Sequence, residues 1–158
     1  MSDIETDDAP RATAPRPAAL PRTHGTLIDR LGMEIDPDSV SPSSCTARMP
    51  VEGNTQPFGL LHGGATAALA ETVGSYAAQA HAGPGRSAVG LELSITHHRG
   101  ARDGTVTAVA TAVHLGRTSA TYLVEVTDEA ERRISSARLT CLLLDGAGSP
   151  PASTSGAS

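Results

Sequence analysis

The segment QPFGLLHGGATAALAETVGS, residues 56–75, decides the fold of this chain. Its second half is rich in alanine, which loses little side-chain entropy in a helix. Apolar residues recur there at helical spacing, at Ala65, Leu69, Val73 and Tyr76. The spacing predicts a helix that begins near Gly63. Glu71 is then a lone carboxylate among alanine, leucine and valine.

The start of this helix can receive a carbonyl group. Gly63 and Gly64 let a substrate approach the backbone closely. The first N–H groups of a helix have no intrahelical partner, and they lie at the positive end of its dipole. Such groups stabilise a carbonyl oxygen that becomes negative during acyl transfer. The sequence therefore predicts a site for an acyl carbonyl at this point.

Glu71 is too far along the helix to share that carbonyl within one chain. It follows Gly63 by eight residues, which is about 12 Å along the axis. If both act on one thioester, they come from two chains with antiparallel helices, in a two-fold dimer. Ser75, four residues after Glu71, could hold a water or orient the carboxylate. The spacing alone also fits a plainer interpretation, with an ordinary helix start and a solvated Glu71.

The remaining elements are predicted to be strands, because their side chains alternate between apolar and polar. The expected strands are 31–36, 45–51, 88–98, 105–115, 118–127 and 133–144. One helix followed by an antiparallel run indicates an α+β protein with the helix on one face of a curved sheet. Alternation in the third strand directs His97 inward and His98 outward, so the pair does not form a metal site.

The segment at 56–75 resembles the active-site segment of the hotdog-fold acyl-CoA thioesterases. The resemblance is to the aryl-CoA branch, which contains 4-hydroxybenzoyl-CoA thioesterase and the 1,4-dihydroxy-2-naphthoyl-CoA thioesterase of menaquinone biosynthesis. It continues through AVGLELSITHHRGARDG (88–104), TAVHLGRTSATYLVEVTDE (111–129) and RRISSARLTCLLL (132–144). The similarity therefore covers most of the chain outside its tails.

The resemblance implies a hotdog fold, in which a curved antiparallel sheet of five to six strands wraps one long central helix. It also implies that Glu71 is the nucleophile or general base, where the phenylacetyl-CoA branch has Asp. Gln56 and His62 would assist at the thioester, and Ser75 would position water. The Gly63 N–H would polarise the carbonyl. The expected assembly is a homodimer with shared active sites, in a dimer of dimers.

Coenzyme A carries phosphates, which an acidic protein must meet with local positive charge. Arginine suits phosphate oxygens because its guanidinium is planar and forked. The N–H groups of Gly116 and Arg117 could form a phosphate nest with the hydroxyls of Thr118 and Ser119. The resemblance places His97 near the pantetheine or acyl pocket. The substrate-binding candidates are Gly64, His97, Arg99, Arg102, Gly116, Arg117, Thr118 and Ser119.

The composition of the chain limits the number of domains and the classes of function that it can have. The chain has 158 residues, 39% of them hydrophobic, which supports one domain at 23–145 between disordered tails at 1–22 and 146–158. All twelve basic residues are arginine, which excludes Schiff-base lysines and Walker-type phosphate loops. The net charge of −5 argues against a nucleic-acid partner.

No segment has the pattern of a signal peptide or a membrane span, so we expect a cytoplasmic protein with no membrane partner. Cys45 and Cys141 lack metal-ligand spacing and are predicted to be buried free thiols. No metal or cofactor is expected.

The sequence thus predicts a hydrolase of an acyl-CoA thioester, with an aromatic acyl group such as 1,4-dihydroxy-2-naphthoyl. Two alternatives stay open. The acyl group could be carried on the phosphopantetheine of a carrier protein, or the chain could be an acyl-CoA-binding regulator without turnover. Glu71 in place of an apolar residue argues against the regulator.

Overall fold

The computed structural model describes residues 23–146. The tail predicted at 1–22, and the second tail from residue 147 onward, lie outside the described residues. The elements are, in order, α1 (Leu27–Arg30), β1 (Glu34–Ile35), the 3-10 helix η1 (Pro37–Ser39), β2 (Ser44–Pro50), α2 (Gly63–Ala82), β3 (Arg86–His97), β4 (Thr105–Leu115), β5 (Ser119–Thr127) and β6 (Arg133–Asp145).

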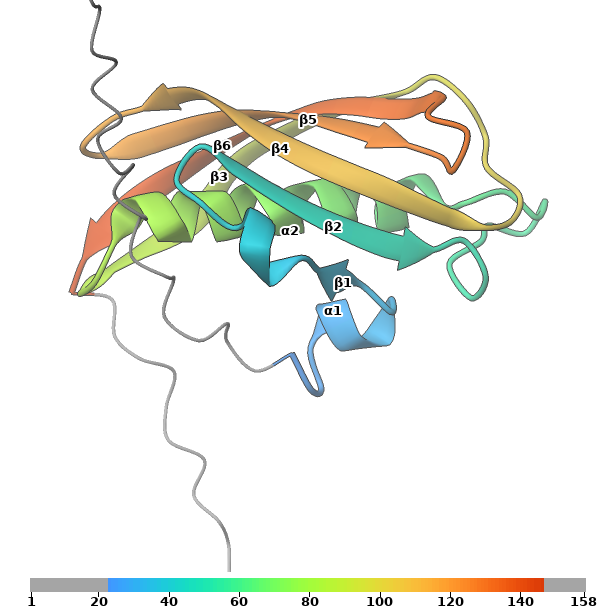
Figure 1. The fold of residues 1–158 in the computed structure, drawn as a ribbon, viewed down its shortest axis with the longest axis horizontal. Helices are drawn as coiled ribbons and strands as arrows, with labels where there is room; N and C mark the ends of the chain where they lie inside the picture. The colour runs from blue at the N-terminus through green and yellow to red at the C-terminus, as the bar shows by residue number, and fades with distance from the viewer. Residues whose placement is uncertain (1–22, 147–158) are drawn as a thin grey trace, which may run out of the picture.

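The six strands form one antiparallel sheet in the order β1-β2-β4-β5-β6-β3. The long helix α2 lies across one face of this curved sheet (Figure 1). The α+β hotdog architecture is confirmed, with six strands wrapped around one central helix. None of the helices in residues 23–146 combines the length and apolar composition needed to cross a bilayer.

The first predicted strand is largely wrong. Of residues 31–36, only Glu34 and Ile35 are extended and paired with β2. Leu31 caps the end of the short helix α1, which the sequence analysis missed. The Asp36 side chain accepts from the Asp38 N–H and starts η1, so local hydrogen bonds end the strand at both sides.

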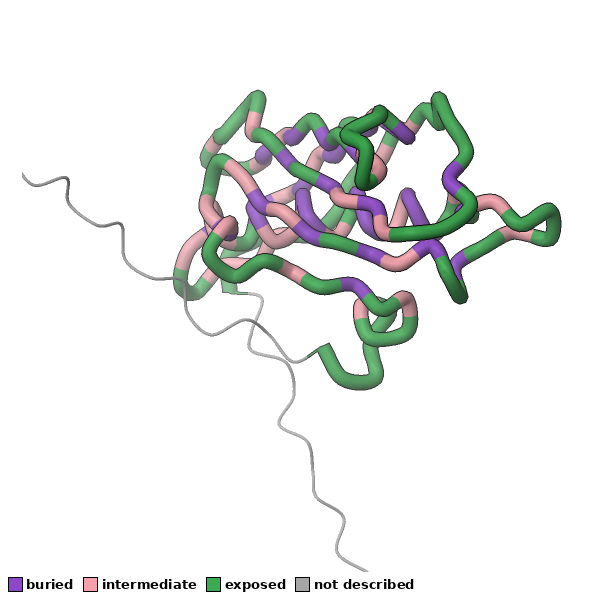
Figure 2. The backbone as a smooth tube through the Cα atoms, turned by 45° about the vertical axis from the view of Figure 1, so that its right-hand side comes forward, coloured by how far each residue is buried: buried purple, intermediate pink, exposed green. Residues whose placement is uncertain are grey.

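The core lies between α2 and the inner face of the sheet. Buried residues alternate with more exposed ones along the central strands, and α2 carries a buried stripe (Figure 2). Tyr122 on β5 is the largest fully buried side chain within residues 23–146, and its hydroxyl donates to Pro42 O at 2.9 Å. Cys45 and Cys141 are free and buried, as predicted.

The helix approaches the sheet very closely because its inner face is made of small residues. At Gly74 there is no room for a side chain: a Cβ placed there would lie 2.5 Å from a methyl of Leu139 on β6. Ala70, Ala77 and Ala78 are also fully buried. The alanine-rich sequence of α2 therefore sets the depth at which the sheet wraps it.

The strand β3 is an edge strand, and α2 runs antiparallel alongside it. β3 pairs with β6 on one side, and no other strand among residues 23–146 covers its outer edge. The first part of this edge is capped by Gln79 of α2, whose amide donates to Arg86 O at 3.0 Å and accepts from the Ala88 N–H at 2.9 Å. The edge beyond Ala88 is open.

Candidate active site

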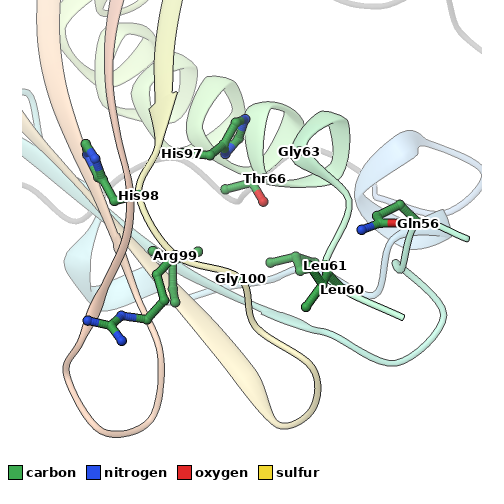
Figure 3. Close-up of a pocket in the computed structure, with 10 residues that line it drawn as sticks. Gln56, Leu60, Leu61, Gly63, Thr66, His97, His98, Arg99 and Gly100 are labelled. Carbon is green, nitrogen blue, oxygen red and sulfur yellow. The ribbon is translucent and has the colours of Figure 1, made fainter. Parts of the chain in front are cut away.

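A pocket of about 370 Å³ lies at the N-terminal end of α2. Its walls come from the loop before α2, the first turn of α2 and the segment that follows β3 (Figure 3). Predicted site residues line it together with apolar side chains, including Gln56, Leu60, Gly63, Thr66, His97 and Arg99. The sequence analysis did not single out Leu60, Thr66 or Ile134, because isolated apolar and threonine residues carry no signal of their own.

The imidazole of His62 caps the start of α2. Its Nδ1 accepts from the Gly64 N–H at 2.8 Å. Because this nitrogen accepts, the neutral ring carries its proton on Nε2, which remains a donor. The Gly63 N–H has no acceptor among the described residues and belongs to the pocket wall. The helix start therefore leaves one backbone donor for a ligand, whereas the His62 side chain is exposed and does not line the pocket.

Gln56 is held by its own loop. Its Oε1 accepts from the Phe58 N–H at 2.7 Å, and its backbone N–H donates to Leu60 O at 2.8 Å. The oxygen is occupied, and the amide nitrogen is turned toward the pocket (Figure 3). Gln56 therefore offers hydrogen-bond donors to a bound molecule.

His97 points toward α2, and His98 points away from it (Figure 3), as the alternation predicted. The His97 Nδ1 lies 2.9 Å from the hydroxyl oxygen of Ser135, which is fully buried. The His98 Nε2 lies 2.7 Å from the hydroxyl oxygen of Ser136 on the outer face. Ser135 was missed, because its relation to His97 follows from the register of β3 on β6 and has no local signal.

Glu71 and Ser75 lie further along α2 and do not line this pocket. The carboxylate of Glu71 is exposed and lies against β3, where a Cβ on Gly90 would be 3.2 Å from Glu71 Oε1. The contact falls at an irregularity in the pairing of β3 with β6, between Gly90 and Glu92. A single chain therefore does not bring Glu71 to Gly63, which is about 12 Å away along the helix.

The buried thiol beside this carboxylate is not a nucleophile. Burial raises the pKa of Cys141, Glu71 raises it further, and a hydrogen bond with Ser75 opposes the shift. A raised pKa keeps the group as the unreactive thiol. No three His, Cys, Asp or Glu side chains within residues 23–146 converge on a point that could hold a metal ion.

The predicted phosphate-binding residues divide between the two ends of α2. Arg99 lines the pocket at the N-terminal end, and Arg102 is exposed in the following loop. The turn 116–119 lies at the other end, where His81 Nε2 is 2.9 Å from Gly116 O. Gly63 and His81 are about 27 Å apart along the axis. One chain therefore does not join the two groups into one site.

Hydrogen bonding refines the predicted phosphate nest. The Gly116 N–H donates to Ser119 O at 2.9 Å, so it is not free for a phosphate. The N–H groups of Arg117 and Thr118 have no acceptor among the described residues. No carboxylate in the described part of the chain pairs with the Arg117, Arg99 or Arg102 side chain, whereas Arg86, Arg132, Arg133 and Arg138 all have such partners.

Comparisons with known proteins show which family this chain resembles. Residues 58–135 match the family model of the thioesterase superfamily. The chain is 43% identical over 121 residues to the proofreading thioesterase EntH of Cronobacter turicensis, which covers 76% of this chain and 87% of that protein. A thioesterase structure from Haemophilus influenzae superposes with a TM-score of 0.74 at 35% identity, over 80% of this chain and 87% of the other.

A thioesterase from Staphylococcus aureus superposes with a TM-score of 0.70 at 31% identity, over 75% of this chain and 98% of the other. Structures of that protein have been solved with a glutamine and, separately, a glutamate replaced by alanine.

Proposed function

This chain belongs to the thioesterase superfamily and is a thioester hydrolase, and we propose that it cleaves an aromatic acyl-CoA, such as 1,4-dihydroxy-2-naphthoyl-CoA, to the free acid and coenzyme A. The observation that carries this proposal is the division of the catalytic groups along α2. Carbonyl-binding donors line a pocket at its start, and the only carboxylate of α2, Glu71, lies at the open edge of β3. Each half is incomplete without a second chain.

A two-fold dimer through the open edge of β3 completes the site. An exposed strand edge offers unpaired N–H and C=O groups to a second strand. Gln79 blocks the beginning of the edge, so the open part runs from Val89 to His97 and has its middle at Leu93. An axis near Leu93 pairs antiparallel copies of β3 with Gly90 opposite Thr96 of the partner subunit.

That register brings the two halves together. On one protomer, Glu71 lies against Gly90. On the partner, the residue after Thr96 is His97, which lies against Gly63. Because α2 runs alongside β3 in each protomer, the dimer places the Glu71 of one chain beside the first turn of the other chain's helix. In the same dimer, the turn 116–119 of one chain lies on the side of the Arg99 loop of its partner, so the two groups of predicted phosphate-binding residues come closer together.

The chemistry follows from these groups. The Gly63 N–H of one chain polarises the thioester carbonyl, with a donor amide from Gln56 nearby. Glu71 of the other chain either attacks the carbonyl carbon, giving an acyl-glutamyl anhydride that water hydrolyses, or takes a proton from a water held by Ser75. The His62 Nε2–H can donate to the departing thiolate. Neither route requires a metal or a redox cofactor.

The assignment of Gln56 and Glu71 has independent support. The glutamine and glutamate replaced in the Staphylococcus aureus thioesterase are fifteen residues apart, and Gln56 and Glu71 have the same separation. The two chains therefore share this pair in spacing as well as in residue type. An aromatic acyl group is supported by the apolar wall of the pocket, which includes Leu60, Leu61 and Ile134.

One experiment tests the substrate class. Rates of hydrolysis are measured for a panel of aromatic and straight-chain acyl-CoAs. The account predicts that kcat/KM is highest for an aromatic acyl group, and a clear preference for long straight chains would contradict it. We propose the cytoplasm as the location and a dimer of dimers as the assembly, in keeping with a coenzyme A substrate and a β3-paired dimer.

A second candidate substrate is an acyl group on a carrier protein. It is favoured by the 43% identity to a protein named a proofreading thioesterase. The test is to measure kcat/KM for the same aromatic acyl group carried on coenzyme A and on a phosphopantetheinylated carrier protein. A higher kcat/KM on the carrier protein would make that the preferred substrate.

A further inference from the structure

The turn between β4 and β5 is held by three hydrogen bonds to its carbonyl groups. Gly116 O accepts from His81 Nε2 at 2.9 Å. Arg117 O accepts from Arg86 Nη2 at 2.8 Å. Thr118 O accepts from the Leu143 N–H at 2.9 Å. Three successive carbonyls of an exposed turn are therefore directed into the protein by residues of α2, β3 and β6.

This arrangement determines where the N–H groups of the turn point. None of the described peptide bonds is cis, and in a trans peptide the C=O and the following N–H point in opposite directions. The N–H groups of Arg117 and Thr118 therefore point away from the residues that hold the turn, whereas the Ser119 N–H lies on the side of Ser119 O, which faces Gly116. Neither the Arg117 N–H nor the Thr118 N–H has an acceptor among residues 23–146. Successive N–H groups facing one direction form an anion-binding nest.

The nest depends on His81, because a two-residue hairpin loop usually closes on itself. The usual closing bond would run from the Ser119 N–H to Gly116 O. Here Gly116 O is held by His81, and only the reverse bond, from the Gly116 N–H to Ser119 O, is formed. A carbonyl can only accept, so His81 carries a proton on Nε2.

Arg86 is a rigid support for the same turn. Its Nε donates to Asp145 at 2.7 Å, and its Nη2 donates to Leu143 O at 3.1 Å as well as to Arg117 O. Its side chain is only 24% exposed. Asp145 neutralises its charge, so the role of Arg86 is to hold the Arg117 carbonyl in place by a hydrogen bond. The unpaired charge beside the nest comes from Arg117.

We propose that His81 and Arg86 are positioning residues that present the N–H groups of Arg117 and Thr118 to a phosphate of the substrate's pantetheine-bearing group. The inference rests on the proposed function. The turn belongs to the protomer that supplies Glu71, and His81 lies about 15 Å beyond Glu71 along α2. The turn therefore lies along the helix from a thioester held at Glu71, on the side away from the Gly63 of the same chain.

The test compares three substrates with the same acyl group, namely acyl-pantetheine, acyl-4′-phosphopantetheine and acyl-CoA. The variants are Arg86→Met and His81→Leu, and Arg48→Met on β2 is the control for the loss of one exposed arginine. Both test variants should raise KM for acyl-CoA by roughly tenfold, as expected for losing hydrogen bonds to a charged group. KM for acyl-pantetheine and kcat for both substrates should stay within about twofold, because the reacting groups are untouched.

The rescue variant is His81→Gln, whose amide nitrogen can donate where Nε2 did, and it should restore most of the lost affinity. A KM effect that already occurs with acyl-4′-phosphopantetheine assigns the nest to the phosphate next to pantetheine. An effect confined to acyl-CoA assigns it to the nucleotide phosphates.

The inference is overturned if either variant changes KM equally for acyl-pantetheine and acyl-CoA, or changes neither, while its Tm matches that of the wild type. A variant with a lowered Tm is replaced by Arg86→Lys, which keeps the positive charge but lacks the planar guanidinium. KM for acyl-pantetheine and acyl-CoA is then compared in the same way. Failure of the proposed function has a different signature, namely a wild-type enzyme that hydrolyses none of the three thioesters.

Discussion

The imidazole of His97 lies directly against Gly63, the first residue of α2. A Cβ placed on Gly63 would be 2.8 Å from His97 Nε2, which is closer than real Cβ atoms come to any neighbour. The ring cannot move away freely, because its Nδ1 is hydrogen-bonded to the buried Ser135. The position of the Gly63 N–H, the proposed carbonyl donor, is therefore fixed by contact with a histidine of β3.

This contact predicts the effect of Gly63→Ala. The added methyl displaces either the imidazole or the first turn of α2, so kcat should fall by roughly a hundredfold, as when a donor to a developing oxyanion is lost. Steady-state kinetics measure the effect, and circular dichroism checks the fold. In a His97→Ala background the clash is absent, so Gly63→Ala should then cost much less. Strictly additive losses would show that the contact is not the cause.

Glu71→Gln should lower kcat by roughly a thousandfold or more and leave Tm nearly unchanged, because in the proposed mechanism the carboxylate acts in the chemical step. Its exposure and its place beside Gly90 give it no packing role in a single chain. The control is Glu125→Gln on β5, which also removes an exposed carboxylate. More than a tenth of wild-type kcat in Glu71→Gln would remove the residue from the mechanism.

Arg117→Ala should raise KM for acyl-CoA more than for the matching acyl-pantetheine, since only acyl-CoA carries phosphates. The same comparison for Arg102→Ala tests the group at the other end of α2. Arg132→Ala is the control, because Arg132 is paired with Asp128 and lies outside both groups. Equal effects on the two substrates would show that the arginine does not contact a phosphate.

Gly74→Ala tests the close approach of helix and sheet. Replacing glycine by alanine inside a helix normally stabilises it by up to about 1 kcal/mol. Here the new Cβ would meet a Leu139 methyl at 2.5 Å, so we expect a net loss of about 1–3 kcal/mol in the free energy of unfolding, as in other overpacked cores. Denaturant titration measures it. A stabilised Gly74→Ala protein would mean that the sheet can move away at little cost.

Much of the fold follows from local sequence. The alanine-rich run with glycines at its start predicted α2, and alternation predicted five of the strands to within about two residues. The same alternation gave the directions of His97 and His98 correctly. The short helix α1 and the brevity of β1 were missed, because they depend on hydrogen bonds within a turn-rich segment with little periodicity.

Fewer of the contacts in the candidate site could be predicted from the sequence. That Ser135 is the partner of His97, and that Gly90 is the neighbour of Glu71, follows from the pairing of β3 with β6 and from the irregularity after Gly90. The bonds from His81 and Arg86 to the turn 116–119 join residues more than thirty positions apart. Contacts of this kind are set by tertiary packing and leave no local pattern.

The central claim is that each active site is built from two chains, and mixed dimers test it most directly. Chains with Glu71→Ala and one affinity tag are co-expressed with chains carrying Gln56→Ala and another tag, and two-step purification isolates the mixed dimers. Each variant is first assayed alone to determine its residual activity.

In a mixed dimer one site receives both defects, and the other combines the intact Glu71 of one chain with the intact Gln56 of its partner. The account predicts about half of wild-type kcat per dimer, given two-fold symmetry. Mixed dimers no more active than the parent variants would place Gln56 and Glu71 in the same site of one chain and contradict the account.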